Sequence, residues 1–196
     1  MTRTDIIQTL INKIDAKSYL EIGVGSGINF KTINCNNKTS VDPYPYVPVD
    51  YSLTSDAFFN QNIETFDVIF IDGLHWAEQV YRDIKNSLLI LNPGGYIICH
   101  DMNPHTEVMQ LYPQKIPESE WTGDCWKAWV KIKSEDDSLD MVVVNTDYGC
   151  GIIRRGRQEI IEVKNELTWD YLNSDRNRLL NLVSVEYFNK FIRDEA

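Results

Sequence analysis

The chain has 196 residues, of which 43% are hydrophobic and 11% aromatic, and its formal net charge is −10. This length predicts one globular domain with a substantial core and argues against two full domains. The acidic balance gives no general attraction to nucleic-acid backbones or anionic membranes, so neither is an expected partner.

The cysteines and the N-terminal segment bear on the cellular compartment. The four cysteines are scattered, with no C-x-x-C pair and no cysteine and histidine set at the spacing of a zinc site, which predicts reduced thiols rather than bound zinc. The first residues lack the apolar run of a secretory signal, and no segment approaches the ~20 apolar residues of a membrane span. We therefore expect a cytoplasmic location and no membrane association.

Strand-like and helical patterns alternate along the chain, as is typical of α/β proteins. We expect a single domain with an N-terminal helix in residues 1–15, a cofactor-binding core over 16–155 and a helical extension over 156–196. The expected strands cover residues 18–23, 39–42, 66–72, 96–101, 141–145 and 150–154, and the expected helices include 77–91, 126–133 and 169–192. The unbroken apolar run at 66–72 predicts a central strand covered on both faces.

A glycine-rich loop follows the first expected strand. The motif runs E-x-G-x-G-x-G and contains Glu21, Gly23, Gly25 and Gly27, and Asp42 ends the next strand 21 residues after Glu21. In an open α/β sheet this edge forms the ligand crevice, and a carboxylate at that spacing accepts hydrogen bonds from ribose hydroxyls. The spacing differs from G-x-G-x-x-G, so it favours a nucleoside over a dinucleotide pyrophosphate. The alternative is that these glycines only form a tight turn.

Two further features accompany this loop: Asp72 closes a later strand, and Pro93-Gly94-Gly95 precedes another. With these residues the chain resembles the class I S-adenosylmethionine-dependent methyltransferases over most of residues 15–155, in particular small stand-alone members associated with sugar and polysaccharide biosynthesis. The resemblance implies a doubly wound, Rossmann-like, mostly parallel seven-stranded sheet with an antiparallel last strand and helices on both faces.

The resemblance also implies roles for individual residues. Glu21 and the Gly23, Gly25 and Gly27 loop would hold the amino-acid part of S-adenosylmethionine, and Asp42 its ribose. Ser55 and Asp56 would lie near the adenine, with Asp72 also at the cofactor. For Asp56 the alternative is that it belongs to a helix that Thr54 or Ser55 merely caps.

The segment Asp72-Gly-Leu-His75-Trp76 follows the expected central strand and carries the candidate catalytic residues Asp72 and His75. Methyl transfer from a sulfonium is an in-line displacement, so an enzyme has to position the acceptor and, for an alcohol, remove its proton. An imidazole with a pKa of ~6.5 suits that task. The alternative is that His75 only caps a helix or binds a loop carbonyl.

A metal ion is a further possibility, because Asp101 ends the next strand and would lie near Asp72. Two carboxylates at one site attract Mg²⁺, which would bind and acidify a substrate hydroxyl. Metal-dependent O-methyltransferases resemble this arrangement, but they carry an asparagine next to the second acid. Here that position is Met102, and Asn103 is displaced by one, which argues against the metal.

The segment 121–129 contains three of the five tryptophans, Trp121, Trp126 and Trp129. They would either offer stacking faces to a planar or sugar ligand or pack against the sheet. Asp124 and Lys127 are possible substrate contacts.

The expected function is methylation of a small molecule, with O-methylation of a sugar or related hydroxyl compound suggested by the resemblance. The alternatives are a catalytically inactive nucleoside-binding or regulatory module on the same fold and an NAD-dependent dehydrogenase, which the glycine spacing disfavours. The oligomeric state stays open, a homodimer included.

Overall fold

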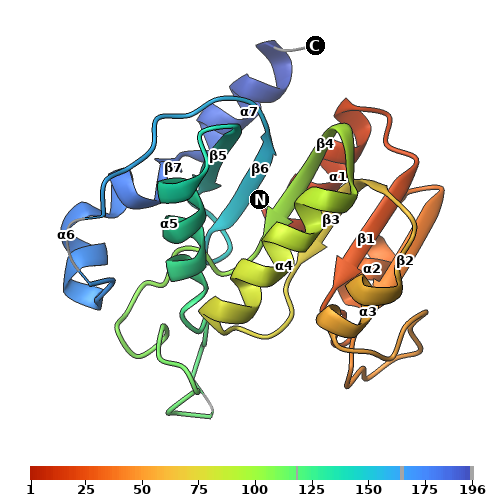
Figure 1. The fold of residues 1–196 in the computed structure, drawn as a ribbon, viewed down its shortest axis with the longest axis horizontal. Coiled ribbons are helices and arrows are strands. Elements are labelled where there is room, and N and C mark those ends of the chain that lie inside the picture. The colour runs from red at the N-terminus through yellow and green to blue at the C-terminus, as the bar shows by residue number, and fades with distance from the viewer. Residues whose placement is uncertain (118, 164–165, 195–196) are drawn as a thin grey trace.

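The computed structural model describes residues 1–117, 119–163 and 166–194. Its strands are β1 (Ser18–Ile22), β2 (Asn37–Val41), β3 (Phe66–Ile71), β4 (Leu91–Cys99), β5 (Leu139–Val144), β6 (Cys150–Arg155) and β7 (Leu182–Val183). The helices are α1 (Arg3–Lys13), α2 (Ile28–Thr32), α3 (Ser55–Gln61), α4 (Ala77–Ile90), α5 (Cys125–Glu135), α6 (Trp169–Leu180) and α7 (Val185–Asp194). The predicted alternation of helices and strands is confirmed (Figure 1).

The seven strands form one sheet in the order β2-β1-β3-β4-β6-β5-β7. Strand β6 runs antiparallel to both of its neighbours, and the other strand pairs are parallel. The mostly parallel fold with an antiparallel closing strand is therefore confirmed, and the antiparallel strand is β6. Strand β3 lies between β1 and β4 in the interior of the sheet, as its continuous apolar run predicted.

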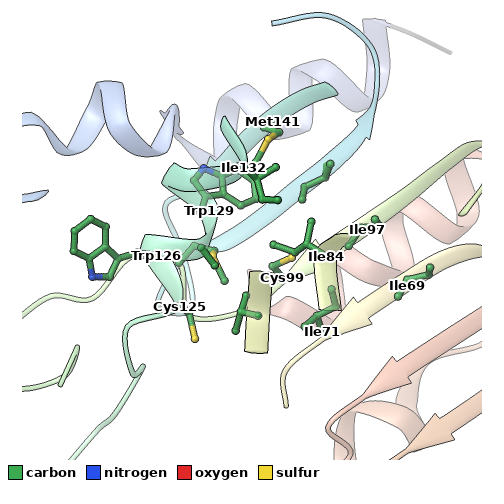
Figure 2. Packing of buried hydrophobic residues seen from close by; sticks show 14 of the residues in the cluster. Ile69, Ile71, Ile84, Ile97, Cys99, Cys125, Trp126, Trp129, Ile132 and Met141 are labelled. Carbon is green, nitrogen blue, oxygen red and sulfur yellow. The ribbon is translucent and has the colours of Figure 1, made fainter. Parts of the chain in front are cut away.

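Alternating side chains of the central strands enter two different cores, because successive residues of a strand point to opposite faces. Ile69 and Ile71 of β3 pack on the face covered by α3, α4, α5 and α6. Figure 2 shows them beside Ile97 of β4 and Ile84 of α4. Val68 and Phe70 of β3 face the other way, into the cluster formed with α1 and α7. Helices on both faces thus fix the sheet and the positions of its strand ends.

One expectation is wrong: residues 169–192 are not a single helix. Asn181 ends α6 in a left-handed conformation (φ 51°), and Leu182 and Val183 then pair with Val143 and Val144 at the edge of the sheet. The Asn181 side chain also donates a hydrogen bond to the carbonyl oxygen of Met141 at 2.8 Å. The free edge of β5 offers backbone partners that the helical periodicity of this segment does not reveal.

A second difference concerns the start of β4. The segment Asn92-Pro-Gly-Gly95 was expected to separate a helix from a strand that begins at Tyr96, but β4 begins at Leu91. Leu91 pairs with Phe66 and Tyr96 pairs with Val68, so the intervening residues form an irregularity inside the strand. The strand ends at Cys99, two residues earlier than expected, so His100 and Asp101 follow it directly instead of belonging to it.

Candidate active site

A cavity of about 810 Å³ opens at the carboxyl ends of β1, β2, β3 and β4. Parallel strands bring their C-terminal ends to one edge of a sheet, so residues distant in the sequence meet there. The predicted site residues that line the cavity are Glu21, Gly23, Gly25, Asp42, Ser55, Asp72, His75 and Asp101. The structure thus brings together most of the residues selected from the sequence.

The glycine loop connects β1 to α2 and passes very close to the end of β3. Gly23 has φ +87°, and a Cβ atom there would lie 2.1 Å from the carbonyl oxygen of Asp72. Glycine is therefore required at this position both by conformation and by space. This close approach places the glycine loop beside Asp72, which begins the segment that carries His75, so both segments line the same cavity.

Asp42 binds the glycine loop directly. Its Oδ2 accepts hydrogen bonds from the backbone N–H groups of Val24 at 2.9 Å and Gly25 at 2.8 Å, and its Oδ1 accepts one from Tyr44 at 2.8 Å. Each carboxylate oxygen has two acceptor sites, so these bonds leave capacity for a ligand hydroxyl. Asp42 consequently has a structural role in shaping the loop in addition to any contact with a ligand.

Glu21 is almost completely buried, with 1% of its surface exposed, yet it lines the cavity. Its Oε2 accepts hydrogen bonds from the Tyr19 hydroxyl at 2.5 Å and from Asn29 Nδ2 at 2.8 Å. Burial raises the pKa of Glu21 to about 7, against the opposing effect of these two donors. The carboxyl group is therefore poised between its charged and neutral forms near neutral pH.

The imidazole of His75 lies between two carboxylates. Its Nε2 is 3.4 Å from Asp72 Oδ1, and its Nδ1 is 3.2 Å from Asp101 Oδ2. Burial alone would lower the pKa of His75, but Asp72 and Asp101 outweigh it and raise the pKa above its ordinary value of 6.5. For Asp72 the balance has the opposite sign. Burial alone would raise the pKa of its carboxyl group, but the facing His100 and His75 outweigh burial and hold this pKa below its ordinary value.

Three residues that no sequence motif singled out complete this cluster: Arg3, His100 and Asp147. His100 Nδ1 is 3.3 Å from Asp72 Oδ1 and 3.1 Å from Asp101 Oδ1. On the other side of the ring, His100 Nε2 is 2.7 Å from Arg3 Nη1, which is itself 3.2 Å from Asp147 Oδ1. Arg3 comes from α1 and Asp147 from the β5–β6 turn, so no local motif connects them.

Two predicted cofactor residues, Gly27 and Asp56, lie outside the cavity lining. Gly27 precedes α2, and a Cβ atom there would lie 2.7 Å from the Val47 side chain. The carboxylate of Asp56 forms an ion pair with Arg82 of α4 at 3.2 Å. Ser55 does line the cavity, and its hydroxyl accepts a hydrogen bond from Gln79 at 3.0 Å.

The three tryptophans of residues 121–129 occupy two environments. Trp126 and Trp129 of α5 are completely buried and belong to the hydrophobic core (Figure 2). Trp121 lines the cavity. Packing against the sheet is therefore correct for Trp129, because a Cβ atom at Gly151 of β6 would lie 2.4 Å from its ring. Trp126 is instead buried beside the preceding loop, where its Nε1 donates a hydrogen bond to Gln110 Oε1 at 2.9 Å.

Asp72, His75 and Asp101 are close enough to one another to bind one divalent cation. One ligand atom from each of Asp72, His75 and Asp101 lies within 4.8 Å of the other two. An amide ligand does not join them, because the Oδ1 of Asn103 accepts a hydrogen bond from Arg176 at 2.6 Å. The oxygens of both carboxylates also face His100, and Asp72 faces Arg3 at 3.9 Å, so protein groups already offset part of their charge.

The comparisons with known proteins agree with this architecture. A family described as a methyltransferase domain matches residues 46–102, from the loop after β2 to just past β4. No curated protein matches the chain. None of the helices in the described part of the chain has the length and apolar character needed to cross a membrane.

Several solved structures share the fold at low sequence identity. A Klebsiella pneumoniae protein provisionally named an O-methyltransferase has a TM-score of 0.59 and 15% identity, over 79% of this chain and 80% of its own. The Podospora anserina methyltransferase PaMTH1 has a TM-score of 0.56 and 17% identity, over 79% of this chain and 78% of its own. The Bacillus cereus O-methyltransferase has a TM-score of 0.52 and 17% identity, over 78% of this chain and 80% of its own. The predicted resemblance is confirmed at the level of the fold: the chain has the class I methyltransferase fold, and its residues 46–102 are similar to the methyltransferase-domain family.

Proposed function

We propose that the protein uses S-adenosylmethionine to methylate a hydroxyl group of a small molecule. One observation carries the proposal: the glycine loop with Glu21 and Asp42 faces Asp72 and His75 across a single cavity at the strand ends. The first group suits an amino acid linked to a nucleoside, and the second suits proton removal from an acceptor. The structures from Podospora anserina and Bacillus cereus contain S-adenosylhomocysteine, which supports this choice of cofactor.

On the cofactor side, Glu21 in its ionised form would accept hydrogen bonds from the ammonium group of the amino-acid moiety. The loop from Gly23 to Gly25 would let the ligand approach the backbone closely, and Asp42 would accept from a ribose hydroxyl with the one acceptor site that remains on Oδ1. Ser55 would contact the adenine end, since it lines the cavity beyond β2.

On the acceptor side, His75 in its neutral form would take the proton of the acceptor hydroxyl. The acceptor oxygen attacks the methyl carbon as the bond from that carbon to the sulfonium sulfur breaks, which yields a methyl ether, S-adenosylhomocysteine and a protonated imidazole. Asp72 and Asp101 stabilise the imidazolium, because both carboxylates lie within 3.4 Å of the ring nitrogens. This route requires no metal ion.

A second candidate places a divalent cation on Asp72, His75 and Asp101, supported by the mutual distances of their ligand atoms. The ion would polarise the acceptor hydroxyl and lower its pKa. The two candidates exclude each other at His75, because a nitrogen that binds a metal is not available as a base.

For the acceptor we propose a sugar or a related polyhydroxyl compound. The support is the resemblance of the chain to stand-alone methyltransferases of sugar metabolism. We also propose a cytoplasmic location, which the four cysteines support, since all of them are free thiols.

The experiment that tests the function is calorimetric titration with S-adenosylhomocysteine, with NADH as the control ligand, followed by a screen of sugar acceptors with S-adenosylmethionine. Binding of S-adenosylhomocysteine and formation of a methylated product are expected. Binding of NADH alone would replace the proposal by a dehydrogenase. Binding of S-adenosylhomocysteine without turnover of any acceptor would favour a regulatory nucleoside-binding module.

A further inference from the structure

His75 lies on a segment without regular structure, between the end of β3 and the start of α4. Its polar contacts do not fully fix the ring, because Nδ1 makes no hydrogen bond of acceptable geometry although Asp101 Oδ2 is 3.2 Å away. A base has to be held within a few tenths of an ångström of its productive position to act efficiently. Some other part of the protein must therefore restrain this side chain.

The indole of Trp121 stacks on the imidazole of His75, with 4.9 Å between ring centroids and an interplanar angle of 28°. Trp121 is itself fixed, because its Nε1 donates a hydrogen bond to the carbonyl oxygen of Leu111 at 2.7 Å. The stack continues through Tyr112, at 6.2 Å from Trp121, to Trp76, at 5.8 Å from Tyr112. A series of four rings thus connects His75 to the N-terminal end of α4.

The backbone that follows Trp121 holds the same segment from a second direction. Gly123 has φ +59°, and a Cβ atom there would lie 1.8 Å from the carbonyl oxygen of His75. Asp124 Oδ1 accepts a hydrogen bond from the backbone N–H of Ala77 at 2.7 Å. It thereby caps α4, whose own N-cap residue, Trp76, makes no side-chain capping bond.

We propose that residues 121–124 form a clamp that positions His75 for proton removal, with Trp121 as the positioning residue that orients the imidazole. The proposal deepens the proposed function and depends on it for the catalytic consequence. The clamp acts at three points of one short segment: the ring of His75, its backbone carbonyl and the first turn of α4. Trp121 is accordingly assigned to the restraint of His75 rather than to stacking on the acceptor.

The test compares Trp121→Leu, which removes the stacking ring, with Trp121→Phe, which keeps one. The matched control is Trp169→Leu, because Trp169 lies on α6 and is covered by the guanidinium of Arg176 at 5.3 Å. The main measurement is the spin relaxation of the His75 Cε1 carbon at fixed pH, which reports the mobility of the imidazole. The Cε1–H chemical shift alone does not report it, because removal of the indole removes its ring current even if the imidazole stays in place. Only three histidines are present, so substitution of each by glutamine assigns the signals.

We expect the imidazole of His75 to become more mobile in Trp121→Leu, to regain most of its restraint in Trp121→Phe and to keep its mobility in Trp169→Leu. With an acceptor in hand, kcat of Trp121→Leu is expected to fall roughly 10- to 100-fold while the affinity for S-adenosylhomocysteine is preserved. Phenylalanine should recover most of that loss.

An unchanged mobility of the His75 imidazole or an unchanged kcat in Trp121→Leu would overturn the clamp. An equal loss of kcat and of S-adenosylhomocysteine affinity would also overturn it, because Trp121 would then be a ligand-binding residue. The relaxation measurement requires neither cofactor nor acceptor. A wild-type protein that fails to bind S-adenosylhomocysteine would therefore refute the proposed function, and the mobility of His75 would still decide whether Trp121 restrains it.

Discussion

The carboxylate of Asp42 is hydrogen-bonded to the backbone of Gly25, with Oδ2 accepting from the N–H group at 2.8 Å. The two residues follow different strands, so this bond ties the end of β2 to the loop after β1. A ligand in the cavity therefore meets a loop whose shape already depends on the acid that would bind the ribose. Substitution of Asp42 removes both functions at once.

The first prediction concerns Asp42→Ala. A hydrogen bond to a charged group contributes about 1.5–3 kcal/mol, so the affinity for S-adenosylhomocysteine should fall about 10- to 100-fold, as measured by calorimetry. The matched control is Asp50→Ala, because Asp50 accepts hydrogen bonds from Ser40 of β2 and does not line the cavity. Equal losses in the two variants would show that the effect is a general disturbance of β2.

The second prediction follows from the burial of Glu21, which raises its pKa from 4.5 to about 7. A raised carboxyl pKa means that the folded state favours the protonated form, so this stabilisation is complete below pH 4.5 and is lost as the pH rises through about 7. Glu21→Gln removes the cost of the buried charge. At pH 8 it should raise the free energy of unfolding by up to about 3 kcal/mol.

The same substitution should weaken binding, since a neutral amide replaces the carboxylate that would contact the cofactor ammonium. Denaturant unfolding at pH 5 and pH 8, together with calorimetry at pH 8, separates the two effects. A variant that is less stable at pH 8 than the wild type, or that binds S-adenosylhomocysteine equally well, contradicts this assignment of Glu21.

Local patterns predicted the elements and the strand-end residues well, because both depend on neighbours in the sequence. The apolar run of Phe66–Ile71 requires a covered strand, and the spacing of Asp42 from Glu21 reflects the length of one crossover. The network of Arg3 with Asp147 lay beyond such reasoning, since 144 residues separate the two. Only the tertiary fold brings α1 against the β5–β6 turn.

Asp56 illustrates a different limit. Its position after β2 is compatible with an adenine contact, but its carboxylate forms an ion pair with Arg82 on the neighbouring helix α4. Competition of this kind depends on how α3 and α4 pack, which hydrophobic periodicity does not specify. For Trp126 and Trp129 the helical spacing was informative, but it allowed both core packing and ligand stacking.

The third prediction concerns the pH dependence of methyl transfer. Asp72 and Asp101 raise the pKa of His75 above 6.5, so the imidazole is mainly protonated in acid and becomes an effective base only as the pH rises. We expect kcat/KM to increase with pH through an apparent pKa above 6.5. His75→Gln should lower kcat by roughly 10²- to 10⁴-fold and abolish this ascending limb, with the affinity for S-adenosylhomocysteine retained. An ascending limb that persists in His75→Gln would assign the base elsewhere.

The fourth prediction is that Asp56→Asn has only a small effect on stability and on cofactor affinity. Asp56→Asn breaks an ion pair in which both side chains are more than 40% exposed, and such pairs contribute about 0–1 kcal/mol. The affinity for S-adenosylhomocysteine should change by less than about twofold, because Asp56 does not line the cavity in this structure. A loss of tenfold or more would mean that Asp56 leaves Arg82 to bind the adenine, as the resemblance implied.

The fifth prediction separates the two candidates for acceptor activation. Because His75 and His100 face the oxygens of Asp72 and Asp101, we expect turnover in a chelator to equal turnover with Mg²⁺ to within about twofold. Mn²⁺ is a useful second probe, since it accepts imidazole more readily than Mg²⁺ does. Activity that disappears with the chelator and returns with Mg²⁺ or Mn²⁺ would transfer the activation of the hydroxyl from His75 to a metal on Asp72, His75 and Asp101.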